Sequence, residues 1–563
     1  MGISGQIDGI VAARLKLIEM LASAANQAQK DGKLAAVTLP EAALERPQNA
    51  DHGDYASSFP LKLARTARAN PMAIAAELVK IMQPDCQIAD ITAAAPGFIN
   101  FTLKTNWLTA QVNSILAAGP TYGNSQKGQG SSLQLEFVSA NPTGPLHVGN
   151  GRGAILGSAL AAVFTAAGYR VEQEYYVNDA GNQVMTFFRS LYARYQQSLN
   201  VDVPMPADGY QGAYMVDLAK EIVAEQGDRF LKMPEAEALK ELGQIGLLKM
   251  LAWIRKDLEM LRVKYDVWFS EESLYKSGLF EQVSAMLRQS GFVTEREGAT
   301  WFVSTALGDD KDNVIIRGDG TPTYFASDIA YHYDKFVLRK FDKVIDIWGA
   351  DHQGHVSRMK AVVSSLGMEP ERLEVLLYQL VTLCRGNEIV RLSKRSGDMI
   401  TLREVVEEVG ADACRFFFLS RSADSQMDFD LELAKKQSQD NPVYYVQYAH
   451  ARISSILNLA VEKDIDYQNG DVSLLTSEPE LALIRKLLRL SEVIEMIVDT
   501  SEPHHLTYYA QDLANVFHSF YKLCRVVTDD AAVTCARLKL VEATRIVLSR
   551  TLGLMGITSP EKM

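Results

Sequence analysis

The spacing of hydrophobic residues changes along this chain and divides it into three regions. Residues 1–118 open with an amphipathic helical pattern at 7–28, pass through a turn-rich middle, and end with a helical pattern at 70–82 and a strand-like run at 97–103. This order predicts a separate α+β domain. The polar, glycine-rich stretch at 119–132 that follows is typical of a linker.

Strand-like and helical patterns alternate in residues 119–405, which predicts a second domain built on a parallel α/β sheet. Apolar runs at 133–140 and 343–348 indicate buried strands, and 154–168 follows the first of them as a helix. A long insertion at about 185–310 is mainly helical, although 295–305 predicts β-structure that returns toward the sheet. Residues 406–563 have helical spacing throughout and predict an all-α bundle.

A loop that binds phosphate is expected between the first strand and its helix, in EFVSANPTGPLHVGNGRGA at 136–154. Its prolines stiffen the turn, and its glycines would let the backbone approach a ligand closely. The unpaired N–H groups and the dipole at the start of the helix favour an anion such as a triphosphate. The residues concerned are Pro142, Pro145, Gly149, Gly151 and Gly153.

The same loop leaves a second interpretation open. Gly149, Gly151 and Ala154 satisfy the G-x-G-x-x-A fingerprint of dinucleotide-binding folds, and Glu174 follows at about the twenty-residue spacing of a ribose-binding carboxylate. A nicotinamide-dependent oxidoreductase therefore stays an alternative on this loop alone, although such a fold needs neither His147 nor the prolines.

A second candidate phosphate contact lies in VRLSKRSG at 390–397, between a strand-like run and a helical pattern. When pyrophosphate leaves a nucleotide, negative charge builds on the β and γ phosphates, and a lysine that reaches them mainly in the transition state lowers the barrier. Lys394 is the candidate, with Ser393 beside it. Taken alone, this segment also fits a solvated basic turn.

Together the two segments resemble the HIGH and KMSKS signatures of class I aminoacyl-tRNA synthetases, and SANPTGPLHVGN at 139–150 resembles the arginine-specific family of that class. Ser393 and Lys394 match the invariant serine and the second lysine of KMSKS. Asn150 stands where the family's second histidine usually lies, which keeps a hydrogen-bond donor but loses a titratable charge. The resemblance implies a Rossmann-like catalytic domain between a tRNA-contacting N-terminal domain and a C-terminal anticodon-binding bundle.

The resemblance also implies a reaction, the ATP-dependent attachment of L-arginine to tRNA(Arg) through an arginyl-adenylate. Mg²⁺ would be carried with ATP, and no zinc is expected. WGADH at 348–352 resembles the G-x-D motif at the adenosine site of the class. The catalytic contacts would come from His147, Asn150 and Lys394. The ATP contacts implied are Pro142, Gly144, His147, Gly149, Asn150, Gly349, Asp351, Ser393 and Lys394.

Candidate arginine-binding residues surround a predicted helix start. Tyr324 and Asp328 are four residues apart and so share one helical face. In the arginine family the matching residues bind the substrate guanidinium, joined by Glu136, Ser139 and Asn141. A guanidinium has five planar donors and a permanent charge, which suit carboxylates and a flat aromatic ring. Without the resemblance, Asp328 fits a helix cap and Tyr324 a core position.

Candidate tRNA-binding residues lie in the last region, where DACR at 412–415 resembles the DALR signature of the family's anticodon-binding bundle. Tyr444, Tyr448 and Arg452 fall on one helical face, suited to stacking on unpaired bases and neutralising their backbone. A tyrosine stripe at this spacing is more often part of a helix core.

Composition narrows the classes of protein that remain. The net charge of −12 argues against a protein that coats nucleic acid without sequence preference, although an enzyme that acts on tRNA needs only local basic surfaces. The five cysteines form no C-x-x-C, and His352 and His355 have no third ligand nearby in sequence, so no metal site is expected. No apolar run is long enough for a membrane span, which predicts a cytoplasmic protein. A monomer is the family's usual state, and a noncatalytic synthetase-like RNA-binding protein is the other alternative.

Overall fold

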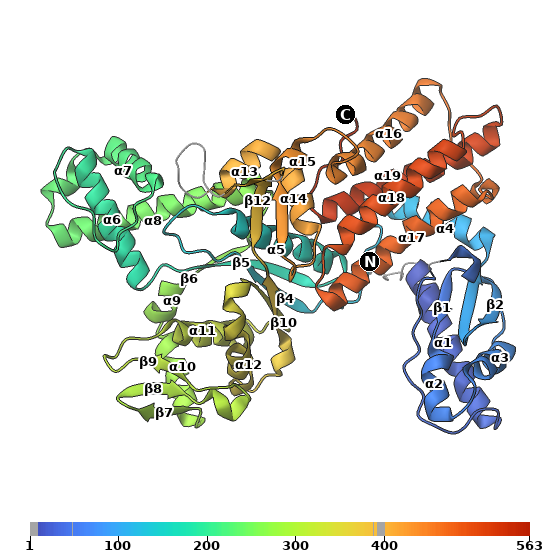
Figure 1. Cartoon of the computed structure of the whole chain (residues 1–563), viewed down its shortest axis with the longest axis horizontal. Coiled ribbons are helices and arrows are strands. Elements are labelled where there is room, and N and C mark those ends of the chain that lie inside the picture. The colour runs from blue at the N-terminus through green and yellow to red at the C-terminus, as the bar shows by residue number, and fades with distance from the viewer. Residues whose placement is uncertain (1–8, 48, 387, 391–399) are drawn as a thin grey trace, which may run out of the picture.

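The computed structural model describes residues 9–47, 49–386, 388–390 and 400–563. Figure 1 shows a blue N-terminal domain at one end, a central sheet with a helical and a mixed α/β extension, and an orange and red helical bundle. The fold class expected from the sequence is confirmed. No helix within the described ranges combines the length and apolarity that crossing a bilayer requires.

The N-terminal domain is an antiparallel sheet in the order β1-β3-β2, formed by β1 (Tyr55–Ser57), β2 (Ile88–Ala94) and β3 (Phe98–Leu103). It carries α1 (Gly9–Lys30), α2 (Phe59–Ala67) and α3 (Pro71–Ile81). The next helix, α4 (Thr105–Ala118), packs against α17 (Glu478–Thr500) and α19 (Ala531–Leu554) of the C-terminal bundle. The sequence pattern placed residues 105–118 in the first domain, but their apolar face is buried against the last one.

Five parallel strands form the central sheet in the order β11-β10-β4-β5-β6. They are β4 (Ser132–Phe137), β5 (Arg170–Val177), β6 (Val267–Ser270), β10 (Lys343–Gly349) and β11 (Leu373–Tyr378). The chain adds strands on both sides of β4, so the order reverses between β4 and β10. In parallel α/β sheets a ligand binds beyond the carboxyl ends of the strands at such a switch point.

Helix α5 (Val148–Ala166) follows β4 and is buried along most of its length. It approaches the sheet closely because Gly157 has no side chain: a Cβ there would lie 2.2 Å from the Phe137 ring. The tight contact fixes the start of α5 relative to the end of β4. That relationship positions the loop between them.

The region expected to be one insertion is two units separated by a strand of the sheet. Helices α6 (Asn182–Ser198), α7 (Ala213–Gln226) and α8 (Glu235–Met260) come first, and β6 then pairs with β5. The second unit contains α9 (Glu271–Lys276), α10 (Leu279–Gln289) and the antiparallel strands β7 (Val293–Arg296), β8 (Ala299–Phe302) and β9 (Asn313–Ile316).

The expectation that residues 295–305 return to the central sheet is wrong. They pair within the separate sheet β7-β8-β9. Glu297 and Gly298 form the two-residue connection between β7 and β8 with φ of 53° and 75°, the left-handed pair that closes a tight hairpin. A local hairpin therefore outcompetes a long-range strand pairing here.

The chain then forms α11 (Tyr324–Tyr333) with a π-helical turn at Asp334–Leu338, and α12 (Val356–Ser365). A small sheet in the order β13-β12-β14 contains β12 (Val381–Arg385), β13 (Glu388–Ile389) and β14 (Met427–Asp430). Strand β14 lies in the region expected to be wholly helical, because it pairs with β12 of the preceding domain. Short 3₁₀ turns occupy Ala50–His52, Gly119–Thr121, Arg229–Lys232, Ser304–Leu307, Ala350–His355, Pro370–Arg372 and Val472–Leu474.

The remaining helices are α13 (Leu402–Val409), α14 (Ala411–Leu419), α15 (Leu431–Lys435), α16 (Pro442–Glu462), α17 (Glu478–Thr500), α18 (His505–Leu523) and α19 (Ala531–Leu554). The buried Arg415 of α14 links this bundle to the domain of the central sheet. Its guanidinium donates to the carbonyls of Met555 (2.5 Å) and Leu261 (2.6 Å) and to Ser158 Oγ of α5 (2.9 Å). Arg415 of the DACR motif therefore contributes to a domain junction.

Candidate active site

A cavity of about 870 Å³ lies at the switch point, beyond the carboxyl ends of β4 and β10. Its walls come from the β4–α5 loop, the start of α5, helix α11 and the 3₁₀ turn after β10. Segments far apart in the sequence thus meet around one space. The residues predicted from the sequence that line it are Glu136, Ser139, Asn141, Gly144, His147, Gly149, Asn150, Tyr324, Asp328, Gly349 and Asp351.

The loop after β4 turns sharply, and hydrogen bonds from neighbouring elements hold it in that conformation. Val138 and Ser139 have positive φ, 71° and 41°, which is unusual for residues with a Cβ and most of all for valine. Such strain persists only where surrounding contacts impose it. Hydroxyl groups supply those contacts: Tyr265 donates to the Phe137 carbonyl (3.1 Å), Tyr175 to that of Ala140 (2.8 Å) and Tyr214 to that of Thr143 (2.8 Å).

The start of α5 is closed by a reciprocal cap. His147 Nδ1 accepts from the Gly149 N–H (3.1 Å), and Asn150 Oδ1 accepts from the His147 N–H (3.0 Å). Because Nδ1 is the acceptor, the proton of a neutral His147 ring lies on Nε2. Desolvation by the cavity walls lowers the pKa of His147, and the carboxylate of Asp351 opposes that shift only in part. His147 therefore offers a neutral Nε2–H to the cavity.

The glycines of this loop have separate tasks. Gly144 and Gly149 line the cavity, whereas a Cβ on Gly151 would meet Leu402 at 2.5 Å and one on Gly153 would meet Tyr378 at 3.0 Å. The expectation that Gly151 and Gly153 admit a ligand is therefore wrong, since both admit neighbouring side chains. Pro142 is buried under the loop and does not line the cavity.

Ser393 and Lys394 of the second motif lie outside the described residues, but the chain on both sides of their segment is anchored. Val390 donates its N–H to the Leu383 carbonyl (2.9 Å). On the other side, Leu402 donates its N–H to the Leu146 carbonyl (2.8 Å), and Thr401 pairs with His147 as an isolated β-bridge. The segment with Lys394 thus rejoins the described fold beside the first motif.

Two carboxylates that form no ion pair among the described residues interact electrostatically beside α11, and of the two Asp328 lines the cavity whereas Glu271 does not. Asp328 makes no ion pair in the described part of the chain, and burial raises its pKa to about 6. Glu271 is only 3% exposed, its Oε2 has no hydrogen-bond partner among the described residues, and burial, with Asp328 nearby, raises its pKa to about 7. Tyr324 is half-exposed in the cavity wall.

Sequence reasoning missed Glu271 because the residue fell inside the expected insertion. A usable signal was present, since Glu271 directly follows the strand-like run VWFS at 267–270. The carboxyl end of β6 lies at the same edge of the sheet as the ends of β4 and β10.

Glu136 differs from Asp328 because its carboxylate already forms an ion pair with a buried lysine. Its Oε2 accepts from Lys335 Nζ (2.7 Å) and its Oε1 accepts from Ser139 Oγ (2.9 Å). Lys335 also donates to Asp346 Oδ1 (2.8 Å), and His332 Nε2 lies 3.0 Å from Asp346 Oδ2. The π-helical turn presents Lys335 to these two carboxylates.

The far end of the cavity is formed by the turn after β10. A Cβ on Gly349 would lie 2.5 Å from Asp351 Oδ1, so the glycine makes room for that carboxylate, which is largely exposed. His352 and His355 also line the cavity, with ring centroids 5.5 Å apart, and so does Arg358, which sequence reasoning did not single out.

The dinucleotide-binding interpretation required Glu174 to bind a ribose, and the structure does not allow this. Glu174 is fully buried, and its carboxylate accepts from Arg339 Nη2 (2.9 Å) and Gln134 Nε2 (3.1 Å). Desolvated and already bonded, it is not free to bind a ribose. The fingerprint spacing is therefore coincidental here.

A second cavity, of about 740 Å³, lies in the bundle between α16 and α18. Tyr444 and Tyr448 stack with centroids 6.3 Å apart, and the Arg452 guanidinium lies 5.1 Å from the Tyr448 ring and 5.0 Å from the Tyr521 ring. Lys522 adds a second cation to the wall. The three predicted residues thus line a partly exposed cavity rather than the helix core.

Family models match the chain in three consecutive parts. The Arginyl tRNA synthetase N terminal domain matches residues 15–103, the catalytic domain of tRNA synthetases class I (R) matches 111–430, and the DALR anticodon binding domain matches 446–563. The order of the three matches follows the order of the three structural regions.

Whole proteins resemble the chain over its full length. An arginine–tRNA ligase of Dehalococcoides mccartyi is 58% identical over 99% of this chain and 100% of that relative. One of Carboxydothermus hydrogenoformans is 49% identical over 97% of this chain and 98% of that relative. The solved arginyl-tRNA synthetase of Thermus thermophilus shares the fold, with a TM-score of 0.78 at 23% identity over 98% of this chain and 100% of that one. This chain belongs to the arginyl-tRNA synthetase family.

Proposed function

We propose that this chain attaches L-arginine to tRNA(Arg) with consumption of ATP, as a monomer in the cytoplasm. In the first step the arginine carboxylate attacks the α-phosphate, and pyrophosphate leaves. In the second step the terminal ribose hydroxyl of the tRNA attacks the arginyl carbonyl, and AMP leaves. No covalent enzyme intermediate is needed, so positioning and charge stabilisation supply the rate enhancement.

The pair of unbalanced carboxylates is the observation that carries the choice of amino acid. Burial raises the pKa values of both Asp328 and Glu271, and His332 and Arg358 oppose the shift of Asp328 only in part. A guanidinium would donate paired N–H bonds to the Asp328 carboxylate and add positive charge beside both acidic groups, while the Tyr324 ring would pack on its flat face. Lysine cannot complete the planar fork, and neutral citrulline leaves the carboxylates desolvated without a cation.

Glu136, Ser139 and Asn141 have a different role in this proposal. They line the cavity between the Asp328 side and the start of α5, where the amino and carboxylate groups of arginine would lie. Because Lys335 already balances Glu136, this carboxylate orients the substrate and adds little net attraction. Asn141 is held by Gln183 (2.7 Å) and adds a directional contact.

The triphosphate would lie at the start of α5. The His147 Nε2–H and the Asn150 amide would donate to its oxygens, and the helix dipole favours the same charge. Pro142, Gly144 and Gly149 shape the loop, while Gly349 and Asp351 would receive the ribose. Ser393 and Lys394 would reach the departing pyrophosphate, and Mg²⁺ enters with ATP as part of the substrate.

The second cavity is the proposed site for unpaired tRNA bases. Tyr444 and Tyr448 offer stacking faces, and Arg452 supplies positive charge for the backbone. The net charge of −12 would repel the tRNA backbone, and Arg452 and Lys522 provide local positive charge where the tRNA would bind.

Exchange of labelled pyrophosphate into ATP tests the proposal. The full-length chain is incubated with each amino acid, with and without tRNA(Arg), and arginine alone is expected to support exchange. Lysine and citrulline are the matched negative substrates. Exchange with another amino acid, or arginine exchange undiminished in Asp328→Asn, would refute the assignment of the acidic end; tRNA binding without any exchange would favour a noncatalytic RNA-binding protein.

A further inference from the structure

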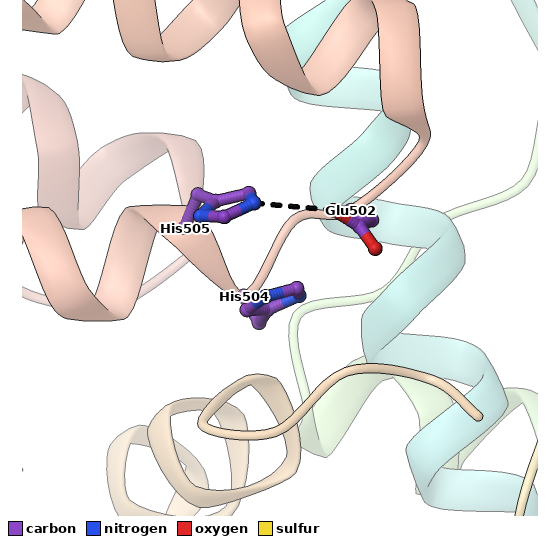
Figure 2. A group of neighbouring side chains, drawn as sticks. All are labelled: Glu502, His504 and His505. Carbon is purple, nitrogen blue, oxygen red and sulfur yellow. Dashed lines mark hydrogen bonds and ion pairs between the residues drawn. The ribbon is translucent and has the colours of Figure 1, made fainter. Parts of the chain in front are cut away.

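The turn between α17 and α18 brings together two imidazoles and a carboxylate outside both cavities. Figure 2 shows Glu502 and His505 facing each other, with the ring of His504 beneath the pair. His505 Nε2 lies 3.2 Å from Glu502 Oε2, and the two histidine rings have centroids 4.2 Å apart. One ligand atom from each residue lies within 4.8 Å of the other two, the only such group of three among the described residues.

His504 supplies an independent sign of a missing partner. Only 8% of its surface is exposed, and its Nδ1 makes no hydrogen bond within the described residues. A buried nitrogen that has lost water without gaining a partner costs free energy, so such atoms are rare in folded proteins. In the neutral tautomer with its proton on Nε2, His504 would present the Nδ1 lone pair to a metal ion.

The donor set selects the ion. Two imidazole nitrogens and one carboxylate oxygen are the ligands of divalent zinc, which binds them at roughly 2.0–2.2 Å in a tetrahedron. Donor atoms around zinc are about 3.4 Å apart, whereas the three here lie within 4.8 Å of one another, so binding requires the side chains to rotate toward one another. Asp424 is a further carboxylate in electrostatic range of His504, and it or water would take the fourth position.

We propose that Glu502, His504 and His505 bind one Zn²⁺ ion at the α17–α18 turn. The nearby segment 419–425 is also bound to the catalytic domain. Arg152 of α5 donates hydrogen bonds to the carbonyls of Ser422 (2.8 Å) and Ser425 (2.9 Å). With Asp424 as its fourth ligand, the ion would link the bundle to this segment and so to the helix that starts at the main cavity. Its role would be structural, and this proposal departs from the expectation, drawn from the sequence, that the chain has no zinc site.

Metal binding by the full-length chain tests the site without using the aminoacylation reaction. After chelator treatment and dialysis, Zn²⁺ is titrated against a chromophoric competitor, and Co²⁺ is added as a spectroscopic probe. One equivalent of Zn²⁺ is expected, with visible tetrahedral Co²⁺ bands and a zinc-dependent rise in Tm. Glu502→Gln and His505→Asn, both at partly exposed positions, should weaken binding at least about tenfold and abolish the rise in Tm.

The controls separate this site from other histidines. His518→Gln removes another half-buried histidine of α18 and should leave zinc binding unchanged. The double variant His352→Asn, His355→Asn should also bind one equivalent, because those residues line the main cavity. No stoichiometric binding by the parent chain, equal binding by Glu502→Gln, or loss of binding in the His352 and His355 variant would overturn the proposal.

Discussion

The Nδ1 atom of His147 accepts a 3.1 Å hydrogen bond from the backbone N–H of Gly149. This one contact both caps helix α5 and directs the Nε2–H toward the cavity. Helix stability and phosphate binding therefore depend on the same side chain, and a substitution that keeps the cap can separate them.

His147→Asn should separate the two roles. Asparagine is a good N-cap, so the free energy of unfolding should change little, whereas His147→Ala should lose roughly 1 kcal/mol. Both variants lose the donor at the Nε2 position, and arginine activation should fall by about 10²-fold in each. Urea unfolding and pyrophosphate exchange measure the two effects. A fully active His147→Asn would contradict the phosphate contact.

Arginine binding should release protons near neutral pH. Asp328 and Glu271, with pKa values raised to about 6 and about 7, are partly protonated in the free protein and should ionise beside the guanidinium. Affinity should therefore rise between about pH 6 and 8. Calorimetry in buffers of different ionisation heat measures the release; buffer-independent heats near about pH 6.5 would count against the paired carboxylates.

Asp328→Asn should be more stable than the parent chain at high pH. A carboxyl whose folded-state pKa is raised stabilises the fold below its unfolded-state pKa and loses that contribution as pH rises through the folded value of about 6. The variant should gain roughly 1–2 kcal/mol at about pH 8, and the gain should vanish below about pH 4. Denaturant titrations at both pH values measure it, and Asp310→Asn, at an exposed position, is a surface control.

Lys394→Ala should reduce the rate of arginine activation by about 10²-fold while leaving the arginine Kd nearly unchanged. The reason is that this lysine is expected to contact pyrophosphate mainly in the transition state. Single-turnover kinetics and equilibrium binding separate the two quantities. Lys436→Ala, at an exposed position, is the control, and equal losses of rate and affinity would contradict a transition-state role.

Tyr448→Ala should weaken tRNA(Arg) binding by roughly 1–3 kcal/mol, the value of one stacked base. ATP affinity in the absence of tRNA should not change, because the second cavity is separate from the first. Tyr508→Ala provides an exposed tyrosine of the same bundle outside that cavity. If both variants bind tRNA equally well, the aromatic cavity is not the base-binding surface.

Sequence patterns were most informative where local chemistry decides the structure. The strand–loop–helix unit at 133–168 was predictable because an apolar run, turn residues and a helical period follow one another directly. The grouping of Glu136, His147 and Asp328 in one cavity rested on the resemblance, since no spacing rule connects residues on β4, α5 and α11. Their roles in binding stay predictions.

The predictions that were wrong or incomplete all depended on contacts between segments far apart in the sequence. Residues 295–305 have the composition of a strand, but composition does not select the partner, and a two-residue turn at Glu297 and Gly298 favoured the local hairpin. Glu271 was overlooked because the short strand β6 is hidden within a long helical region. Gly151 and Gly153 were assigned to a ligand although their neighbours are Leu402 and Tyr378, which no local pattern reveals.

The π-helical turn at Asp334–Leu338 sets a limit on how this chain can vary. Each residue advances a helix by roughly 100°, so losing one residue of the turn would swing the Lys335 ammonium away from the sheet. Glu136 and Asp346 would then lose the ammonium they share, and His332 would be left as the partner of Asp346 alone. Surface loops often tolerate the insertion or deletion of a residue, but within these five positions we expect either change to prevent folding.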